Sequence, residues 1–137
     1  MRGFLLLTAG AMLASCTTAP PEPQMRTAKA EQRYQTLLAG KVPQAPISCL
    51  PSYNANDMEV IDEHTIAFKV GTGRVYVAHM QGGCNMLSNA GPYALVTRQF
   101  GGSGLCHGDI GEVVDTLNHF TVGSCVFGDF TPYVRGR

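Results

Sequence analysis

Five cysteines constrain this chain of 137 residues more than any other feature. Four of them, Cys49, Cys84, Cys106 and Cys125, are spread through a region rich in short alternating apolar segments. The fifth, Cys16, stands apart from them and directly follows an apolar leader. If the chain is exported, the even number of remaining cysteines predicts a small domain closed by two disulfides.

The leader predicts that export. Arg2 supplies one positive charge, and the apolar run after it is too short to cross a bilayer, which needs about 20 apolar residues. The run ends in Leu, Ala, Ser and Cys, which is the pattern of a bacterial lipoprotein signal. We expect residues 1–15 to be a cleaved signal peptide and Cys16 to carry diacylglycerol and a fatty acid such as palmitate, which anchors it in a lipid bilayer. An ordinary signal peptide with a chance cysteine is the alternative. Thr17, in place of Asp, favours the outer membrane, facing the periplasm, over the inner membrane.

Two segments follow the leader. Residues 16–46 contain the lipidated cysteine, a Pro-rich tether and a short helix. The helix is expected over Ala28–Ala39, where Tyr34, Leu37 and Leu38 fall on one face and Gly40 ends it. Residues 47–137 form the disulfide-bearing β domain.

Alternation with a period of two predicts strands in this β domain. Ile66, Phe68 and Val70 fall on one face of the first clear strand, and Gly71-Thr72-Gly73 connects it to the second. The class predicted is therefore all-β and mainly antiparallel, a small sandwich or partial barrel. Strands are expected at residues 65–70, 74–80, 93–100, 110–115 and 120–127.

The four cysteines of the domain allow three pairings. We favour Cys84–Cys106 with Cys49–Cys125, because the second bridge would join the two ends of the domain. Each bridge is expected to contribute about 2–4 kcal/mol.

Charge and histidine spacing argue against several classes of function. The formal net charge is zero and no basic stripe is present, so nucleic-acid binding is not expected. The histidines have no short-spaced pair and there is no C-x-x-C, so neither a metal site nor a cofactor is expected. The acidic residues Asp57, Glu59, Asp62 and Glu63 are interpreted as a solvated turn.

One short stretch, Cys106-His107-Gly108-Asp109, contains residue types of a thiol enzyme. Neighbouring residues of a strand point to opposite faces, so Cys106 and His107 are poorly placed to act as nucleophile and base. Cys106 is also needed for a disulfide. No catalytic residue is therefore assigned.

Several segments, taken in order, form one pattern. They are Cys49, Val60–Ile66, Arg74–Tyr76, Cys84 with Leu87, Leu105–Asp109, and Cys125 with Gly128–Pro132. With this pattern the chain resembles an uncharacterised family of small four-cysteine bacterial lipoproteins, known only as a domain of unknown function. The resemblance implies an exported four-cysteine domain and brings no activity, cofactor or catalytic residue.

The sequence thus favours a membrane-anchored envelope lipoprotein that is not an enzyme and serves as a binding or scaffolding module. Expected partners are another envelope protein, peptidoglycan or a small ligand. The alternative is a small periplasmic enzyme or metal-binding factor that uses His107, Asp109 or His79.

Overall fold

The computed structural model describes residues 26–52, 57–87, 91–100 and 104–136. The signal peptide predicted at residues 1–15, the lipidation site Cys16 and most of the tether lie outside these residues. The described elements are α1 (Ala28–Leu38), β1 (Lys41–Pro43), β2 (Cys49–Leu50), β3 (Met58–Asp62), β4 (Thr65–Val70), β5 (Arg74–Gln81), β6 (Tyr93–Arg98), β7 (Leu105–Cys106), β8 (Ile110–Asp115) and β9 (Phe120–Arg135).

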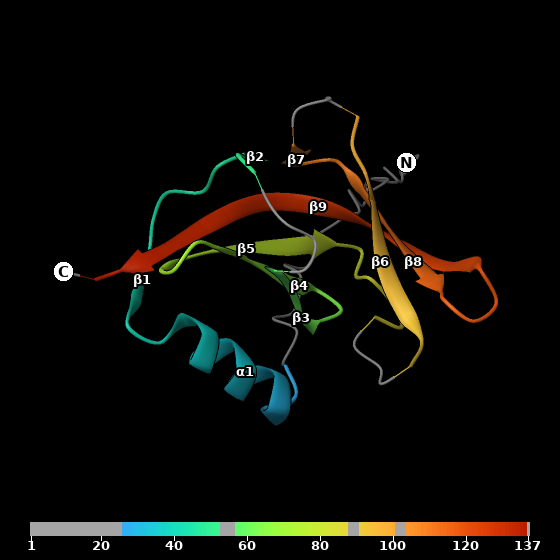
Figure 1. The fold of residues 1–137 in the computed structure, drawn as a ribbon, viewed down its shortest axis with the longest axis horizontal. Helices are drawn as coiled ribbons and strands as arrows, with labels where there is room; N and C mark the ends of the chain where they lie inside the picture. The colour runs from blue at the N-terminus through green and yellow to red at the C-terminus, as the bar shows by residue number, and fades with distance from the viewer. Residues whose placement is uncertain (1–25, 53–56, 88–90, 101–103, 137) are drawn as a thin grey trace, which may run out of the picture.

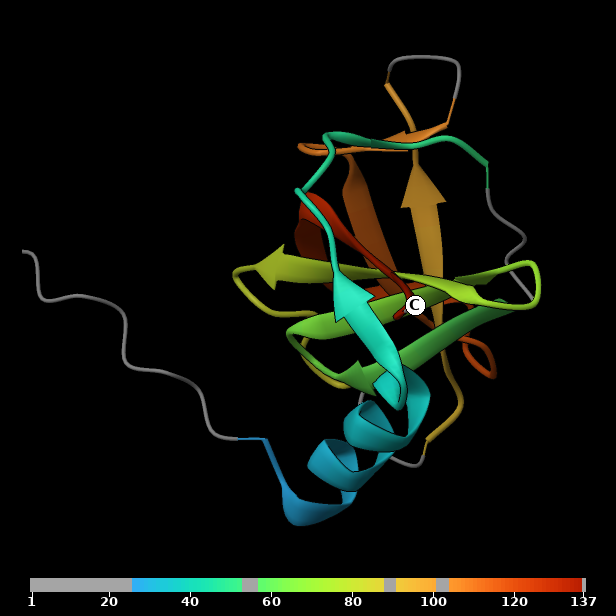
Figure 2. The ribbon, with the colours of Figure 1, turned by 90° about the vertical axis from the view of Figure 1, so that its left-hand side faces the viewer.

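Most strands join one antiparallel sheet in the order β3-β4-β5-β9-β8-β6, and β1 pairs with the last residues of β9. Figure 1 shows how this sheet curls around itself, so the predicted class is confirmed as mainly antiparallel β in a partial barrel. A separate two-stranded sheet, β2–β7, lies on the opposite side of the main sheet from α1 (Figure 2).

Two apolar clusters form on the two faces of the main sheet, because its strands alternate their side chains. Ile66 and Phe68 are fully buried inside the curl, and Val70 packs against the same cluster, as predicted. The centre of this core is three phenylalanines, in which the ring centroids of Phe127 and Phe130 lie 6.1 Å apart and Phe68 lies 6.0 Å from Phe130. The second cluster lies beneath α1.

Helix α1 covers the outer face of the sheet. Its apolar side chains Tyr34, Leu37 and Leu38 pack against Val75 and Val77, which confirms the predicted helical face. Thr27 caps the helix by accepting a hydrogen bond from the amide of Ala30 at 3.2 Å. The helix that the sequence placed before the β domain is thus packed onto it.

Two of the four acidic residues predicted to form a solvated turn, Glu59 and Asp62, belong instead to the edge strand β3. The interpretation was wrong for these two because their carboxylates meet cations from other elements, and Glu59 bonds to Lys69 of the neighbouring strand at 2.7 Å. Glu63 does lie in the turn after β3, and 42% of its side chain is exposed. The last predicted strand was also too short, since β9 continues past Phe127 to Arg135.

The two disulfides are Cys49–Cys106 and Cys84–Cys125, so the favoured pairing of Cys84 with Cys106 and of Cys49 with Cys125 was wrong. The reason lies in strand pairing. Cys49 of β2 is the direct antiparallel neighbour of Cys106 of β7. Cys84 follows β5, which pairs with β9, and Cys125 lies in the adjoining part of β9.

Candidate functional site

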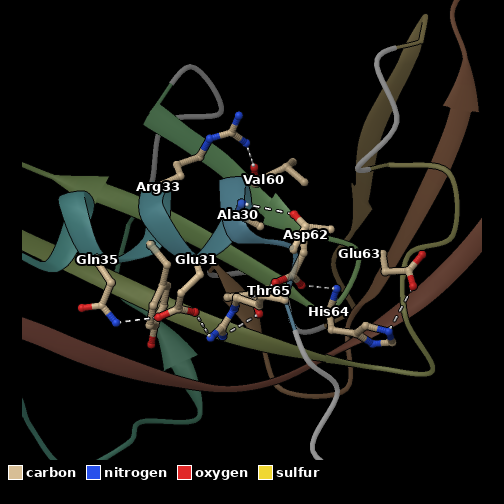
Figure 3. A network of polar contacts seen from close by, with 12 residues as sticks. Ala30, Glu31, Arg33, Gln35, Val60, Asp62, Glu63, His64 and Thr65 are labelled. Atoms are coloured by element: carbon tan, nitrogen blue, oxygen red, sulfur yellow. Dashed lines mark hydrogen bonds and ion pairs between the residues drawn. The ribbon is translucent and has the colours of Figure 1, made fainter.

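Glu31 of α1 lies close to Asp62 and Thr65 of the sheet (Figure 3). Arg26, just before α1, bonds to all three of these residues. Its Nε lies 2.9 Å from Oδ2 of Asp62 at the end of β3, and its Nη2 donates to Oγ1 of Thr65 at 3.1 Å. Its guanidinium lies 4.1 Å from the ring centroid of Tyr34, and Nη1 lies 3.4 Å from Oε2 of Glu31. Only 22% of the Arg26 side chain is exposed. One arginine therefore attaches α1 to the turn between β3 and β4.

Three ionisable groups around this junction have shifted pKa values. The hydrogen bond from Gln35 is the main cause that lowers the pKa of Glu31, with help from Arg26. Burial, with a hydrogen bond to Tyr133, raises the pKa of Tyr34 to about 12. Partial burial and then the charge of Arg26 lower the pKa of His79. These directions favour an ionised Glu31, a neutral Tyr34 and a neutral His79 at neutral pH.

A groove of about 560 Å³ runs between α1 and the edge of the sheet. Glu59 lies between two of its cations, 2.7 Å from Nζ of Lys69 and 3.9 Å from Nε of Arg33. Lys29 adds a further positive charge, so the groove suits a ligand with an anionic or amide group. The residues that line it are Lys29, Gln32, Arg33, Thr36, Leu37, Glu59 and Lys69.

His107 and Asp109, the pair of the alternative hypothesis, are not brought together. Asp109 is 4% exposed, and its two oxygens accept amide hydrogen bonds from Phe100 at 3.0 Å and Cys106 at 2.7 Å. His107 instead pairs with Asp129, with 2.8 Å between Nδ1 and Oδ1 on an exposed surface. Sequence reasoning missed Asp129 as a partner, because only the fold brings β7 beside β9.

The other predicted site residues that the structure describes are the four cysteines of the two disulfides. The Cys84–Cys125 bridge is buried in the main core, whereas Cys49 of the other bridge is exposed. Within the described ranges, no group of three or more His, Cys, Asp or Glu side chains is placed to hold a metal ion. No helix among those same residues is long and apolar enough to cross a membrane.

Comparisons with known proteins give no relative. No family model, no curated protein and no solved structure matches the chain. The resemblance to the uncharacterised lipoprotein family stays a prediction from the sequence.

Proposed function

We propose that this chain is a bacterial envelope lipoprotein, anchored through an acylated Cys16, whose β domain is a binding or scaffolding module. The observation that carries the proposal is the Arg26 junction. Contacts with Asp62 and Thr65 hold the chain to the sheet where the predicted tether ends, so the domain would be attached firmly to that tether. At about 3.1 Å per residue, the Pro-rich tether predicted from the sequence would let the domain lie at any distance up to about 30 Å from the lipid.

A binding role is supported over catalysis by the state of Asp109. Both of its oxygens already accept backbone amides in a buried turn, so a role as a base or a metal ligand would require that turn to open. The alternative, a small periplasmic enzyme or metal-binding factor that uses His107 and Asp109, has one observation in its favour, the exposed pair of His107 with Asp129. Replacing His107 with Ala discriminates between the two hypotheses. A binding module should still bind its partner after this change, whereas an enzyme that uses His107 should lose its activity in the cell.

The groove between α1 and the sheet is the proposed site for a partner, with an envelope protein or peptidoglycan as candidates. A photo-crosslinking residue at Thr36 tests this in intact cells. The control is the same replacement at Thr116, because both threonines are exposed and both hydroxyls donate to a backbone carbonyl. We expect a specific adduct from position 36 only. Equal labelling from the two positions would argue against the groove.

The anchor is tested separately by mass spectrometry and membrane fractionation. Cys16→Ser is expected to leave the chain unprocessed or released from membranes, with the β domain unchanged. Thr17→Asp is expected to move the protein from the outer to the inner membrane. Native protein with an intact Met1 and no fatty acid would refute the anchor, and an unchanged location of the Thr17 variant would refute the outer-membrane assignment.

A further inference from the structure

Three cations that have no carboxylate partner among the described residues lie at one end of the main sheet, and two of them are exposed while Lys41 is half-buried. Lys41 of β1 is the register partner of Arg135 at the end of β9, and Arg74 at the start of β5 pairs with the residue before Arg135. A Cβ at Gly73 would lie 3.7 Å from Nε of Arg135, so the β4–β5 turn touches the same cluster. We call Lys41, Arg74 and Arg135 the basic end.

The segments that form the basic end contain no acidic residue of their own. Residues 41–43, 70–74 and 133–136 contain no Asp or Glu. Within the part of the chain that the structure describes, none of the three cations forms an ion pair. Lys41 donates to the carbonyl of Leu37 at 2.8 Å, and Arg74 to the hydroxyl of Tyr76 at 3.4 Å. Val42, which follows Lys41 in β1, is 45% exposed.

Two acidic side chains lie toward the other end of the domain. Glu112 and Asp115 belong to β8, which with β6 lies far from β1 in Figure 1. Arg98, the cation of β6, is paired with Glu112 at 3.0 Å. The zero formal net charge is that of the whole chain, whereas residues 47–137 contain five Lys or Arg and eight Asp or Glu, so the basic end is a local positive patch on a domain of formal charge −3.

We propose that the basic end docks on the anionic phospholipid surface that holds the protein's own lipid anchor. A negative surface attracts this end and repels the β6–β8 end, so it orients the domain. Exposed Val42 offers an apolar contact at the headgroup boundary. The proposal rests on the proposed anchoring at Cys16.

Chain length permits this orientation. The segment from Cys16 to Arg26 reaches about 34 Å when fully extended at about 3.4 Å per residue. Helix α1, with 11 residues, is about 16 Å long and ends three positions before Lys41. The tether is thus long enough for the basic end to touch the bilayer in which the lipid is inserted.

The test uses the full-length protein purified from bacterial membranes and reconstituted with two kinds of vesicle, pure phosphatidylcholine and phosphatidylcholine with phosphatidylglycerol. Flotation measures whether the protein is attached to the vesicles, and amide hydrogen exchange measures whether the basic end is in contact with their surface. We expect the β4–β5 turn to exchange more slowly on the anionic vesicles only, and the β8–β9 turn to be unchanged. High salt, about 1 M, shortens the Debye length to about 3 Å and should abolish the difference.

Arg74→Gln and Arg135→Gln should each lower the docking equilibrium about fivefold, and together about 25-fold. Arg98→Gln is the matched control, since it removes the same charge from the opposite end, and it should have no effect. If the protein floats with both kinds of vesicle but the β4–β5 turn exchanges equally fast on both, docking is refuted and the lipid anchor is supported. Flotation with anionic vesicles alone would support docking and refute the anchor. Binding to peptidoglycan sacculi that needs the same arginines, without binding to vesicles, would overturn the lipid assignment.

Discussion

The two disulfides should respond very differently to a reductant, because they differ in exposure and hardly at all in loop length. Cys84 and Cys125 are 0% and 3% exposed inside the main core, whereas Cys49 lies on the surface of the small β2–β7 sheet. A thiolate must reach a sulfur atom to open a disulfide. A dithiol such as dithiothreitol should therefore open Cys49–Cys106 first in the folded protein.

Loop length alone does not separate the bridges. The cysteines are 57 positions apart in one pair and 41 in the other, and a chain-entropy model gives about 4 kcal/mol of stabilisation for each loop. A small domain has about 5–15 kcal/mol in total, so it should survive the loss of one bridge with a lower melting temperature. Replacing Cys84 and Cys125 with Ala should cost about 1 kcal/mol more than replacing Cys49 and Cys106, because it also removes packing around Phe127.

The assay is limited reduction under native conditions, followed by alkylation and peptide mass spectrometry. We expect an intermediate in which Cys49 and Cys106 are alkylated and Cys84–Cys125 is intact. Urea unfolding of the two double-alanine variants gives the free energies of unfolding. Opening of the buried bridge first, or simultaneous opening of both in folded protein, would refute the argument from exposure.

Three further predictions concern single side chains. Phe130→Ala should cost about 3–5 kcal/mol in urea unfolding, while Phe120→Ala, at a position that is 53% exposed, should change stability by less than about 0.5 kcal/mol. Hydrogen bonds from Asn118 lower the pKa of Asp115 below its ordinary 3.8, so Asp115→Asn should destabilise the protein at neutral pH. The difference in free energy of unfolding between the native protein and the variant should vanish as pH falls through the lowered pKa. A difference that persists in acid would contradict this prediction. Arg26→Ala should lower the free energy of unfolding by about 1–2 kcal/mol and speed amide hydrogen exchange in α1, and Arg26→Lys should have a smaller effect of the same kind. Equal exchange rates in α1 for the native protein and both variants would contradict the role given to Arg26.

Local patterns were sufficient to predict the β4–β5 hairpin and the helix. Alternation at Ile66, Phe68 and Val70 is set by the two faces of one strand, and the stripe on α1 is set by helical spacing. Both patterns are contained in the residues that form the element, so no knowledge of the partner strands was needed. The antiparallel class followed from the same local signals.

Features that depend on distant partners were not predictable. The carboxylates of β3 look like a solvated turn until Arg26, Arg33 and Lys69 are placed beside them by the fold. The disulfide pairing depends on which strands become neighbours. The candidate site was affected in the same way, because the partner of His107 is Asp129 from another strand and not Asp109 next to it in sequence.

One more prediction tests whether β9 continues past Phe127, the residue at which the alternation in the sequence places its end. The sequence predicted that this strand stops at Phe127, yet Gly128 lies inside it. A Cβ at Gly128 would lie 2.6 Å from the carbonyl oxygen of His79, at the irregularity in the β5–β9 register. Gly128→Ala should therefore force the two backbones apart and cost about 1–3 kcal/mol.

Gly123 offers the matched control in the same strand. A Cβ there would meet the carbonyl oxygen of Asn85 at 3.5 Å, which is an ordinary contact. Gly123→Ala should raise stability by about 0.4–1 kcal/mol, because it restricts the unfolded chain. Opposite signs for the two variants in urea unfolding are expected if β9 runs unbroken past β5. A neutral effect at Gly128 would mean that the strand ends where the local pattern placed its end, since only a continuous strand brings that glycine against the β5 backbone.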